Sequence, residues 1–254
     1  MLESILKRFQ LQVPIRYDRV GDSPLEAEMK HCIAALLGVV AMTLSLECQA
    51  AQSWTQGRNY VLLSPVQPTT VPAGKVEVME VFSYGCPACN GFQPIVEKLK
   101  NSLPPNAQLV FLPASFNPSE DWPMLQRAYF AAQSLGIAER THQGIYDAVW
   151  KSGELAVSDP VTHRLRYPQP SIEDAAKCYE RMTGVKPEAF LAAAKSFAVD
   201  VKIRAADAQV AAMQVPSTPC IVVNGKYRVI LDSLSSTDDL IDLVKYLVMK
   251  ESTH

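Results

Sequence analysis

Residues 76–89 read Val76-Glu77-Val78-Met79-Glu80-Val81-Phe82-Ser83-Tyr84-Gly85-Cys86-Pro87-Ala88-Cys89. The first half is mostly apolar and β-branched, which predicts a central buried strand over residues 75–82. A helical pattern begins at Cys86 and continues to about Leu103, where Pro104-Pro105-Asn106 ends it. We therefore expect a Cys-x-x-Cys motif at the point where a strand leads into the first turn of a helix.

The two cysteines of this motif are placed for dithiol exchange. A thiol in the first turn of a helix faces unpaired backbone N–H groups and the positive end of the helix dipole, which lower its pKa. Cys86 is therefore the expected nucleophile. Cys89 lies one turn further along and is expected to resolve a mixed disulfide. Pro87 suits the helix start because it lacks only an N–H that would have no helical partner there.

The whole chain has the composition of a globular protein. It has 254 residues, is 48% hydrophobic and carries a net charge of −2, which is enough for one large or two small cores. Nothing in the charge indicates nucleic-acid binding.

A secretory signal peptide is predicted over residues 29–50. The apolar run 33–46 follows Lys30-His31 and precedes small residues up to Ala50, and it is too short to span a bilayer comfortably. Cleavage after Ala50 would start the mature chain near Ala51. Residues 1–28 are polar and acidic, so we expect translation to begin at Met29. The alternative is a genuine start at Met1, with a cytoplasmic extension and an uncleaved anchor.

Beyond residue 51 the patterns predict an interrupted α/β sheet domain. Strands are expected at 58–65, 75–82 and 107–113, and a hairpin at 221–231 turns at Asn224-Gly225. Helices are expected at 86–103, 121–135, 144–151, 171–182, 187–213 and 236–249. We interpret residues 51–116 and 198–254 as two parts of one sheet domain, and 117–197 as an all-helical insertion.

A second motif precedes the hairpin, Val215-Pro216-Ser217-Thr218-Pro219-Cys220. Together with the segment 82–89, the helical insertion and Val223-Asn224-Gly225-Lys226-Tyr227, it resembles the DsbA-type thiol:disulfide oxidoreductases of the periplasm. The resemblance covers nearly all of the chain from about Asn59 onward. It implies a thioredoxin fold with an inserted helical domain.

The resemblance also implies a function and partners. The resemblance implies a monomeric oxidase of the periplasm that needs no cofactor or metal. Such an oxidase would donate its Cys86–Cys89 disulfide to newly exported proteins. A quinone-linked membrane oxidase of the DsbB type would then re-oxidise it. In such a fold Pro219 is held cis against the cysteine pair, so Thr218 would offer its backbone to an extended client beside Pro87 and Ala88. The alternative for Pro219 is an ordinary loop proline.

Two departures from the family leave the direction of transfer open. Ala88 stands where members often have histidine, which predicts a less acidic Cys86 and a less oxidising disulfide. Thr218 before the proline is more usual in isomerases and reductants of the wider superfamily. A disulfide reductase or isomerase is therefore the alternative. A redox-independent export chaperone is a third, and it predicts activity that survives a Cys86→Ser change.

Glu80 lies on the predicted buried strand, six residues before Cys86. Burial raises a carboxyl pKa, so Glu80 is a candidate to relay a proton to or from Cys89. The alternative is a carboxylate at a sheet edge, in water. Gln93 and Leu112 stand where the family places charged partners of this acid, which leaves the proton path open.

The remaining cysteines and histidines lie outside the two motifs. Cys32 and Cys48 fall in the predicted signal peptide. Cys178 and Cys220 would form a structural disulfide between the two domains, remain free thiols, or join the other pair in a zinc site of unusual spacing. His142, His163 and His254 are interpreted as surface residues, and Trp122, Phe130 and Tyr146 as core of the helical domain.

Overall fold

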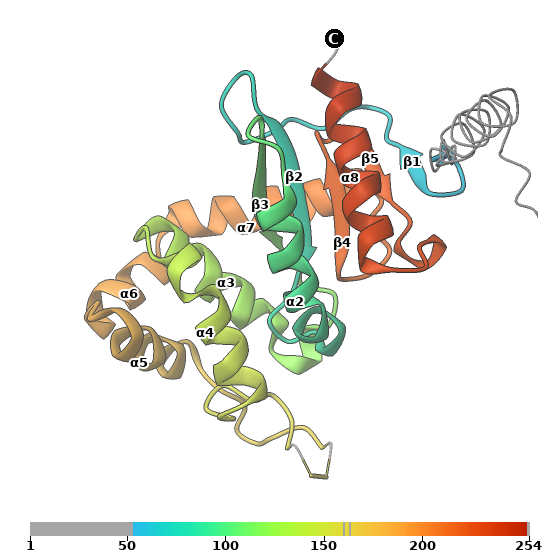
Figure 1. The fold of residues 1–254 in the computed structure, drawn as a ribbon. Coiled ribbons are helices and arrows are strands. Elements are labelled where there is room, and N and C mark those ends of the chain that lie inside the picture. The colour runs from blue at the N-terminus through green and yellow to red at the C-terminus, as the bar shows by residue number, and fades with distance from the viewer. Residues whose placement is uncertain (1–52, 160, 163, 253–254) are drawn as a thin grey trace, which may run out of the picture. The chain divides into compact units, whose positions relative to one another are not determined.

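The computed structural model describes residues 53–159, 161–162 and 164–252. The chain divides after Ser53 into two units, and every helix and strand labelled in Figure 1 belongs to the second unit, which begins at Trp54. The predicted signal peptide and both candidate start codons lie outside the described residues, as do His163 and His254.

One mixed sheet of five strands organises the described chain, in the order β1-β5-β4-β2-β3. β2 pairs parallel with β3 and antiparallel with β4, and β5 joins β4 to β1 through antiparallel pairs. All seven residues of β2 are buried, as the apolar run predicts for a central strand. The bounds are β1 (Tyr60–Leu62), β2 (Val76–Phe82), β3 (Ala107–Pro113), β4 (Cys220–Val223) and β5 (Tyr227–Val229).

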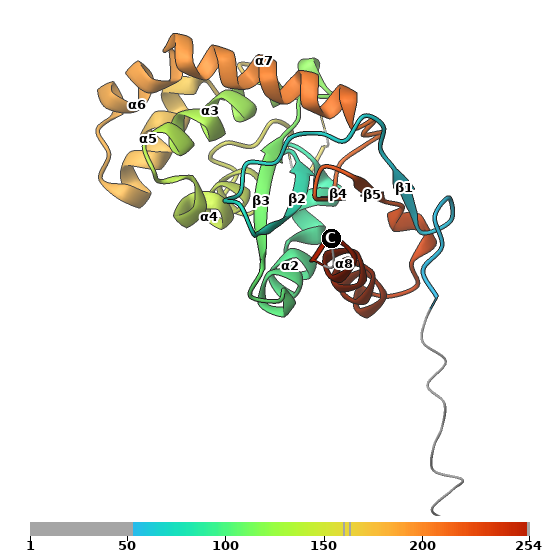
Figure 2. The ribbon, with the colours of Figure 1, turned by 90° about the horizontal axis from the view of Figure 1, so that it is seen from above.

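Helices cover both faces of this sheet. α7 (Phe197–Ala212) lies on one face, and α2 (Pro87–Ser102) and α8 (Thr237–Ser252) lie on the other (Figure 2). Because side chains alternate along a strand, Val76 and Val78 pack in one apolar cluster with residues of α8. Met79 and Val81 belong to a second cluster that includes residues of α7. No described helix is long and apolar enough to cross a membrane.

Four more helices follow β3 and gather beyond that edge of the sheet (Figure 1). They are α3 (Trp122–Ser134), α4 (Ala138–Trp150), α5 (Ile172–Thr183) and α6 (Pro187–Ala194), with short 3₁₀ turns at η1 (Pro118–Glu120) and η2 (Leu231–Ser233) elsewhere in the fold. Trp122, Phe130 and Tyr146 are buried among them, as predicted. The helical insertion is therefore present, while its exact limits at 117 and 197 stay a prediction.

Two helix predictions were wrong. The single helix expected from 187 to 213 ends at Ala194, because Ser196 accepts a hydrogen bond from the Val199 N–H at 3.3 Å and starts α7 as its N-cap. α4 begins at Ala138, six residues before the predicted start. Its first two turns carry His142 inward with only 7% of its surface exposed, so the interpretation of His142 as a surface residue was also wrong.

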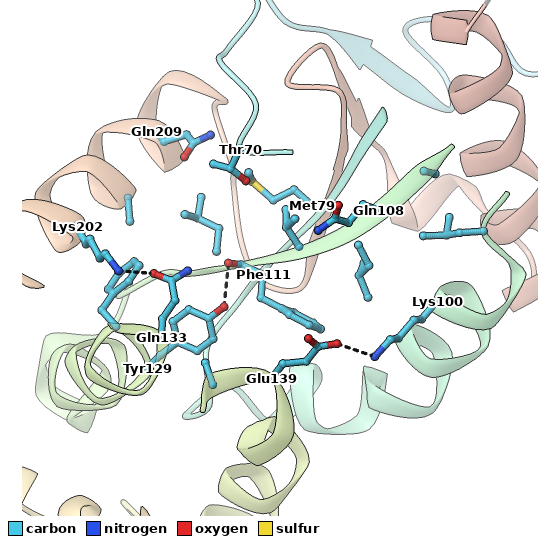
Figure 3. Close-up of a pocket in the computed structure, with 18 of the residues that line it drawn as sticks. Thr70, Met79, Lys100, Gln108, Phe111, Tyr129, Gln133, Glu139, Lys202 and Gln209 are labelled. Carbon is cyan, nitrogen blue, oxygen red and sulfur yellow. Dashed lines mark hydrogen bonds and ion pairs between the residues drawn. The ribbon is translucent and has the colours of Figure 1, made fainter. Parts of the chain in front are cut away.

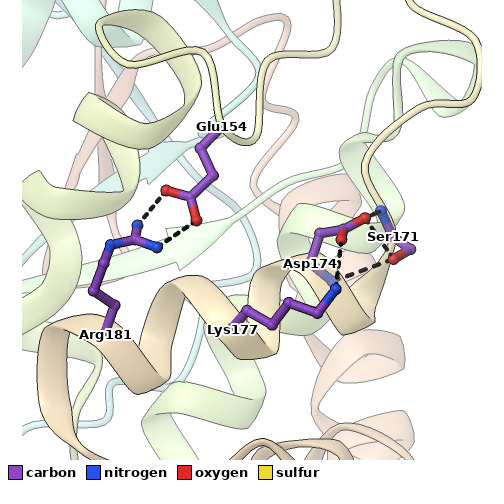
Figure 4. Close-up of polar contacts among 5 residues, drawn as sticks. All are labelled: Glu154, Ser171, Asp174, Lys177 and Arg181. Carbon is purple, nitrogen blue, oxygen red and sulfur yellow. Dashed lines mark hydrogen bonds and ion pairs between the residues drawn. The ribbon is translucent and has the colours of Figure 1, made fainter.

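Polar contacts hold both ends of α5 (Figure 4). Ser171 and Asp174 form a reciprocal capping box, in which the Ser171 side chain accepts from the Asp174 N–H and the Asp174 carboxylate accepts from the Ser171 N–H. Arg181, in the last turn, makes a bidentate ion pair with Glu154. This pair joins α5 to the segment that follows α4.

The hairpin turn between β4 and β5 has the geometry that its sequence predicts. Asn224 and Gly225 both adopt positive φ angles, 53° and 60°, as a type I′ turn requires. Nearby, Glu251 of α8 accepts hydrogen bonds from Asn224 and Tyr227 at 2.7 Å each and from Lys226 at 2.8 Å. The last turn of α8 is thereby fixed to the hairpin.

Candidate active site

Cys86 occupies the N-cap of α2, directly after the turn that leaves β2. Its Sγ accepts a hydrogen bond from the Cys89 N–H at 3.4 Å, and Pro87 lies in the first turn. Cys86 is 5% exposed and Cys89 is completely buried. Both cysteines are therefore buried, and Cys86 is the slightly less buried residue of the two.

The Thr218–Pro219 segment lies against this helix end, although it is 132 residues away in sequence. The Cys86 thiol donates to the Thr218 carbonyl oxygen at 3.4 Å. The Thr218–Pro219 peptide bond is cis, as predicted. The two motifs singled out in the sequence are thus in direct contact.

The environment separates the acidities of the two thiols. The pKa of Cys86 is lowered to about 6, chiefly by a hydrogen bond from the Cys89 thiol, against the opposing effect of burial. The Thr218 side chain and the backbone N–H groups of Cys89 and Ala88 lower it further. The pKa of Cys89 lies well above the usual value for a thiol, chiefly because this thiol is buried. Only Cys86 is expected to be a thiolate at neutral pH.

This difference predicts a selective alkylation. With a pKa of about 6, roughly nine-tenths of Cys86 is thiolate at pH 7, against about one hundredth for a thiol of pKa 9. Iodoacetamide should therefore label reduced protein at Cys86 alone, with a rate that reaches half its maximum near pH 6. Mass spectrometry of peptides from timed samples measures this. Preferential labelling of Cys89, or a midpoint near pH 9, would contradict the assignment.

Glu80 lies on β2 with its carboxyl group completely buried, so the alternative of an edge carboxylate in water was wrong. Within the part of the chain that the structure describes, neither carboxyl oxygen has a hydrogen-bond partner. Burial, together with the nearby Cys86, raises the pKa of Glu80 to about 8. This acid therefore holds its proton at neutral pH.

No cation accompanies Glu80 at the two positions considered in the sequence. Gln93 is buried on α2 and donates from Nε2 to the Cys89 carbonyl oxygen at 3.4 Å. Leu112 is a buried apolar residue of β3, paired in register with Val81. Gln93 is thus attached to the backbone of the resolving cysteine itself.

An aromatic cluster lies behind the Cys-x-x-Cys motif. It includes two contacts of His142 that the sequence did not indicate. The Tyr84 hydroxyl and His142 Nδ1 are 3.0 Å apart, and the His142 ring lies 4.2 Å from that of Phe111. Burial, with a smaller effect of Lys100, lowers the pKa of His142 to about 3, so the imidazole is neutral. The spacing Ala138-Thr141-His142-Ile145 would have placed His142 on the buried face if the helix had been started at 138.

Two tryptophans flank the loop before Cys86. Trp150 Nε1 donates to the Tyr84 carbonyl oxygen at 2.8 Å. A Cβ atom at Gly85 would approach Trp122 Nε1 to 2.7 Å, so this position has no room for a side chain. Both indoles therefore lie against the loop that leads into Cys86.

All four described cysteines are free thiols in the structure, which corresponds to the free-thiol alternative for Cys178 and Cys220 and not to a disulfide between them. Cys178 lies on α5 with its Sγ 3.5 Å from Arg181 Nη2, whereas Cys220 is in β4, paired in register with Val81. Burial raises the pKa of each thiol to about 11. No group of three or more potential metal ligands occurs among the described residues.

Comparison with known proteins agrees with this geometry. Residues 71–245 match the family model described as thioredoxin. The chain is 31% identical to the thiol:disulfide interchange protein DsbA of Pseudomonas aeruginosa over 224 residues, which cover 88% of this chain and 97% of that protein. The chain belongs to the DsbA family. DsbA proteins are thiol:disulfide oxidoreductases, and this chain is therefore a protein disulfide oxidoreductase.

Solved DsbA structures extend the likeness to the fold. DsbA of Xylella fastidiosa superposes with a TM-score of 0.68 at 28% identity, over 79% of this chain and 99% of that one. DsbA of Pseudomonas aeruginosa gives a TM-score of 0.64 at 31% identity, over 79% and 95%. The thioredoxin fold with an inserted helical domain, as predicted, is thus the DsbA fold.

Proposed function

We propose that this DsbA protein works as an oxidase, which donates the Cys86–Cys89 disulfide to unfolded proteins with free thiols. The observation that carries the proposal is the environment of Cys86, a thiolate stabilised at the N-terminus of α2 beside a buried partner. A disulfide becomes more oxidising as its reduced form is stabilised.

The exchange has two steps. A client thiolate attacks Cys86 Sγ, the Cys86–Cys89 bond breaks, and Cys89 leaves with the electron pair and takes up a proton. A second client thiolate then attacks the client sulfur of the mixed disulfide, and Cys86 leaves as a stable thiolate. The client gains one disulfide and the protein becomes a dithiol. Glu80 is the candidate donor of the proton to Cys89, because it is still protonated at neutral pH.

Thr218 and Pro219 are the proposed docking site of the client backbone. The Thr218 carbonyl oxygen lies 3.4 Å from Cys86 Sγ, so a strand that pairs with Thr218 would carry its own sulfur next to the reacting atom. Pro87 and Ala88 are both exposed in the first turn of α2 and would contact the residues beside the client cysteine.

The site of action and the partners follow from the family and from the predicted signal peptide. We place the mature monomer, from about Ala51, in the periplasm, with newly exported proteins as clients and a quinone-linked membrane oxidase of the DsbB type as the partner that restores the disulfide. The domain limits 51–116, 117–197 and 198–254 are part of the same proposal.

Equilibration with glutathione tests the direction of transfer. Purified protein without residues 1–50 is incubated in a series of reduced and oxidised glutathione, and fluorescence of Trp122 and Trp150 reports the fraction oxidised. We expect a potential well above the glutathione couple, and a further rise in Ala88→His, since a histidine would favour the thiolate. A potential near that of thioredoxin would instead indicate a reductase or an isomerase.

A further inference from the structure

The outer edge of β3 borders a groove. Its volume is about 810 Å³, and its lining comes from β3, the end of α2, the helices α3 and α4, and α7 (Figure 3). β3 is the last strand of the sheet, so its far side has no strand neighbour among the described residues. This groove lies on the side of β2 opposite to β4 and the Thr218–Pro219 segment.

The register of β3 determines which backbone groups face the groove. The Val76 N–H donates to Asn106 O, and the Ala114 N–H donates to Phe82 O. In this register the even-numbered residues of β3 direct their backbone N–H and C=O groups toward β2. The odd-numbered residues 107, 109 and 111 therefore direct their N–H and C=O groups away from the sheet, as Pro113 does its C=O.

Several of these outward groups already have partners, and they limit the open stretch. The Ala107 N–H donates to Pro104 O at 2.9 Å. At the other end, the Tyr129 hydroxyl donates to Phe111 O at 3.3 Å and Gln126 Nε2 donates to Pro113 O at 3.0 Å.

What remains is a continuous row of four groups. They are the Ala107 C=O, the Leu109 N–H, the Leu109 C=O and the Phe111 N–H, none of which has a hydrogen-bond partner in the part of the chain that the structure describes. Alternating donors and acceptors at this spacing match the backbone of an extended chain.

The walls of the groove add chemical preferences. Phe111, Tyr129 and Phe130 supply aromatic surface. Lys100 is paired with Glu139 at 3.2 Å, whereas Lys202 contacts only the neutral acceptors Gln133 Oε1, at 2.9 Å, and Ser134 Oγ, at 3.2 Å. The lining therefore carries one positive charge that no carboxylate balances.

We propose that the groove beside β3 binds an extended segment of the client polypeptide, apolar with an acidic residue, as a sixth strand of the sheet. The client would pair with Leu109 and place its carboxylate at Lys202, while its cysteine reacts at Cys86. This proposal rests on the proposed function, because it takes the bound segment to belong to an unfolded client of the oxidase. Because β3 is parallel to β2, Pro113 lies beside Phe82, and Tyr129 and Gln126 cover the edge at that end. The client segment bound at Leu109 would therefore be separate in sequence from the cysteine that reacts at Cys86.

A cysteine-free peptide tests this binding separately from the redox chemistry. The probe is a fluorescein-labelled octapeptide, blocked at both ends, in which isoleucine and valine alternate with threonine and one central glutamate. We expect saturable one-to-one binding by fluorescence anisotropy, weakened by salt. The same peptide N-methylated at alternate residues should bind about five- to tenfold more weakly, because it cannot complete the backbone hydrogen bonds.

Variants locate the site. Leu109→Pro removes only an outward N–H and should weaken binding by about five- to tenfold. Lys202→Gln should weaken binding and reduce its dependence on salt, whereas Lys245→Gln on α8 is the matched control and should bind as the wild type does. Equal affinity of Leu109→Pro and the wild type, or of the methylated and plain peptides, would overturn the proposal.

Amide exchange in the wild-type protein gives a readout that needs no variant. On saturation with the peptide, the Leu109 and Phe111 amides should exchange more slowly, while the Val110 amide, already directed to β2, should change little. Unchanged exchange at Leu109 and Phe111 would reject the groove as the site.

Light scattering tests whether the edge binds a second copy of this chain instead. A dimer that Leu109→Pro dissociates would assign the edge to that second copy and overturn the client assignment. If the protein binds the peptide but does not oxidise thiols, the proposed oxidase function is rejected and the proposed groove is retained.

Discussion

Replacement of Cys86 by serine is expected to reduce disulfide exchange to the uncatalysed background. Cys86 is the less buried residue of the pair, and its pKa of about 6 makes it the better leaving group. The measurement is the rate at which the oxidised wild type, and the variant under the same conditions, oxidise a short dithiol peptide. Oxidation of the peptide by Cys86→Ser would assign the reaction to another thiol, whereas client binding without any faster oxidation by the wild type would favour the chaperone alternative.

Replacement of Cys89 should have a different outcome. Cys86 would still attack a disulfide, but no second thiol would release the mixed disulfide, so Cys89→Ser should accumulate covalent complexes on nonreducing gels. Cys178→Ser is the matched control, since that thiol is buried on α5 beside Arg181 and should leave exchange unchanged. Mixed disulfides that form through Cys178 or Cys220 would contradict these roles.

Glu80 should make the protein less stable as the pH rises from about 4.5 to 8. Its pKa is about 8 in the folded protein and 4.5 ordinarily, so below pH 4.5 the carboxyl is protonated in both states. Between the two values the unfolded chain releases the proton and the folded chain retains it, which favours unfolding. The full loss, reached above pH 8, is about 4 to 5 kcal/mol.

Glu80→Gln should remove this loss, because an amide does not ionise in this range. We expect the free energy of unfolding of the reduced variant, from urea titrations, to exceed that of the wild type by about 4 kcal/mol at pH 8.5 and to approach it at pH 4.5. Glu77→Gln is the control on the same strand. Its carboxylate accepts two hydrogen bonds from Thr70, at 2.7 Å each, so this change should lower stability and leave the effect of Glu80 in place. Equal pH profiles for Glu80→Gln and the wild type would contradict a buried, protonated Glu80.

The parts of the fold that the sequence predicted depend on local chemistry. The buried strand β2, the helix start at Cys86 and the Asn224-Gly225 turn each follow from residues within a few positions of one another. The contact of Thr218–Pro219 with Cys86 is long-range, and it was expected only because the resemblance to a family connected the two motifs.

What the sequence did not predict includes both long-range packing and one local helix start. An even number of cysteines behind a predicted export signal left a disulfide between Cys178 and Cys220 as one alternative, but Cys178 lies on α5 and Cys220 on β4, and composition says nothing of that separation. The break between α6 and α7 depends on Ser196, a cap whose signal was hidden in a long amphipathic run. The open edge of β3 was not predicted either, because strand order is a property of the whole sheet.

The apolar cluster that contains Met79 and Val81 has a consequence for how the molecule unfolds. It runs without interruption from β2 through Phe82 and Tyr129 to Tyr179 and Phe190 of the helical insertion. Because both parts share one core, neither can lose its packing while the other retains it. The described chain should therefore melt as one cooperative unit, and the insertion should behave in evolution as a region that cannot be exchanged without the strand it packs against.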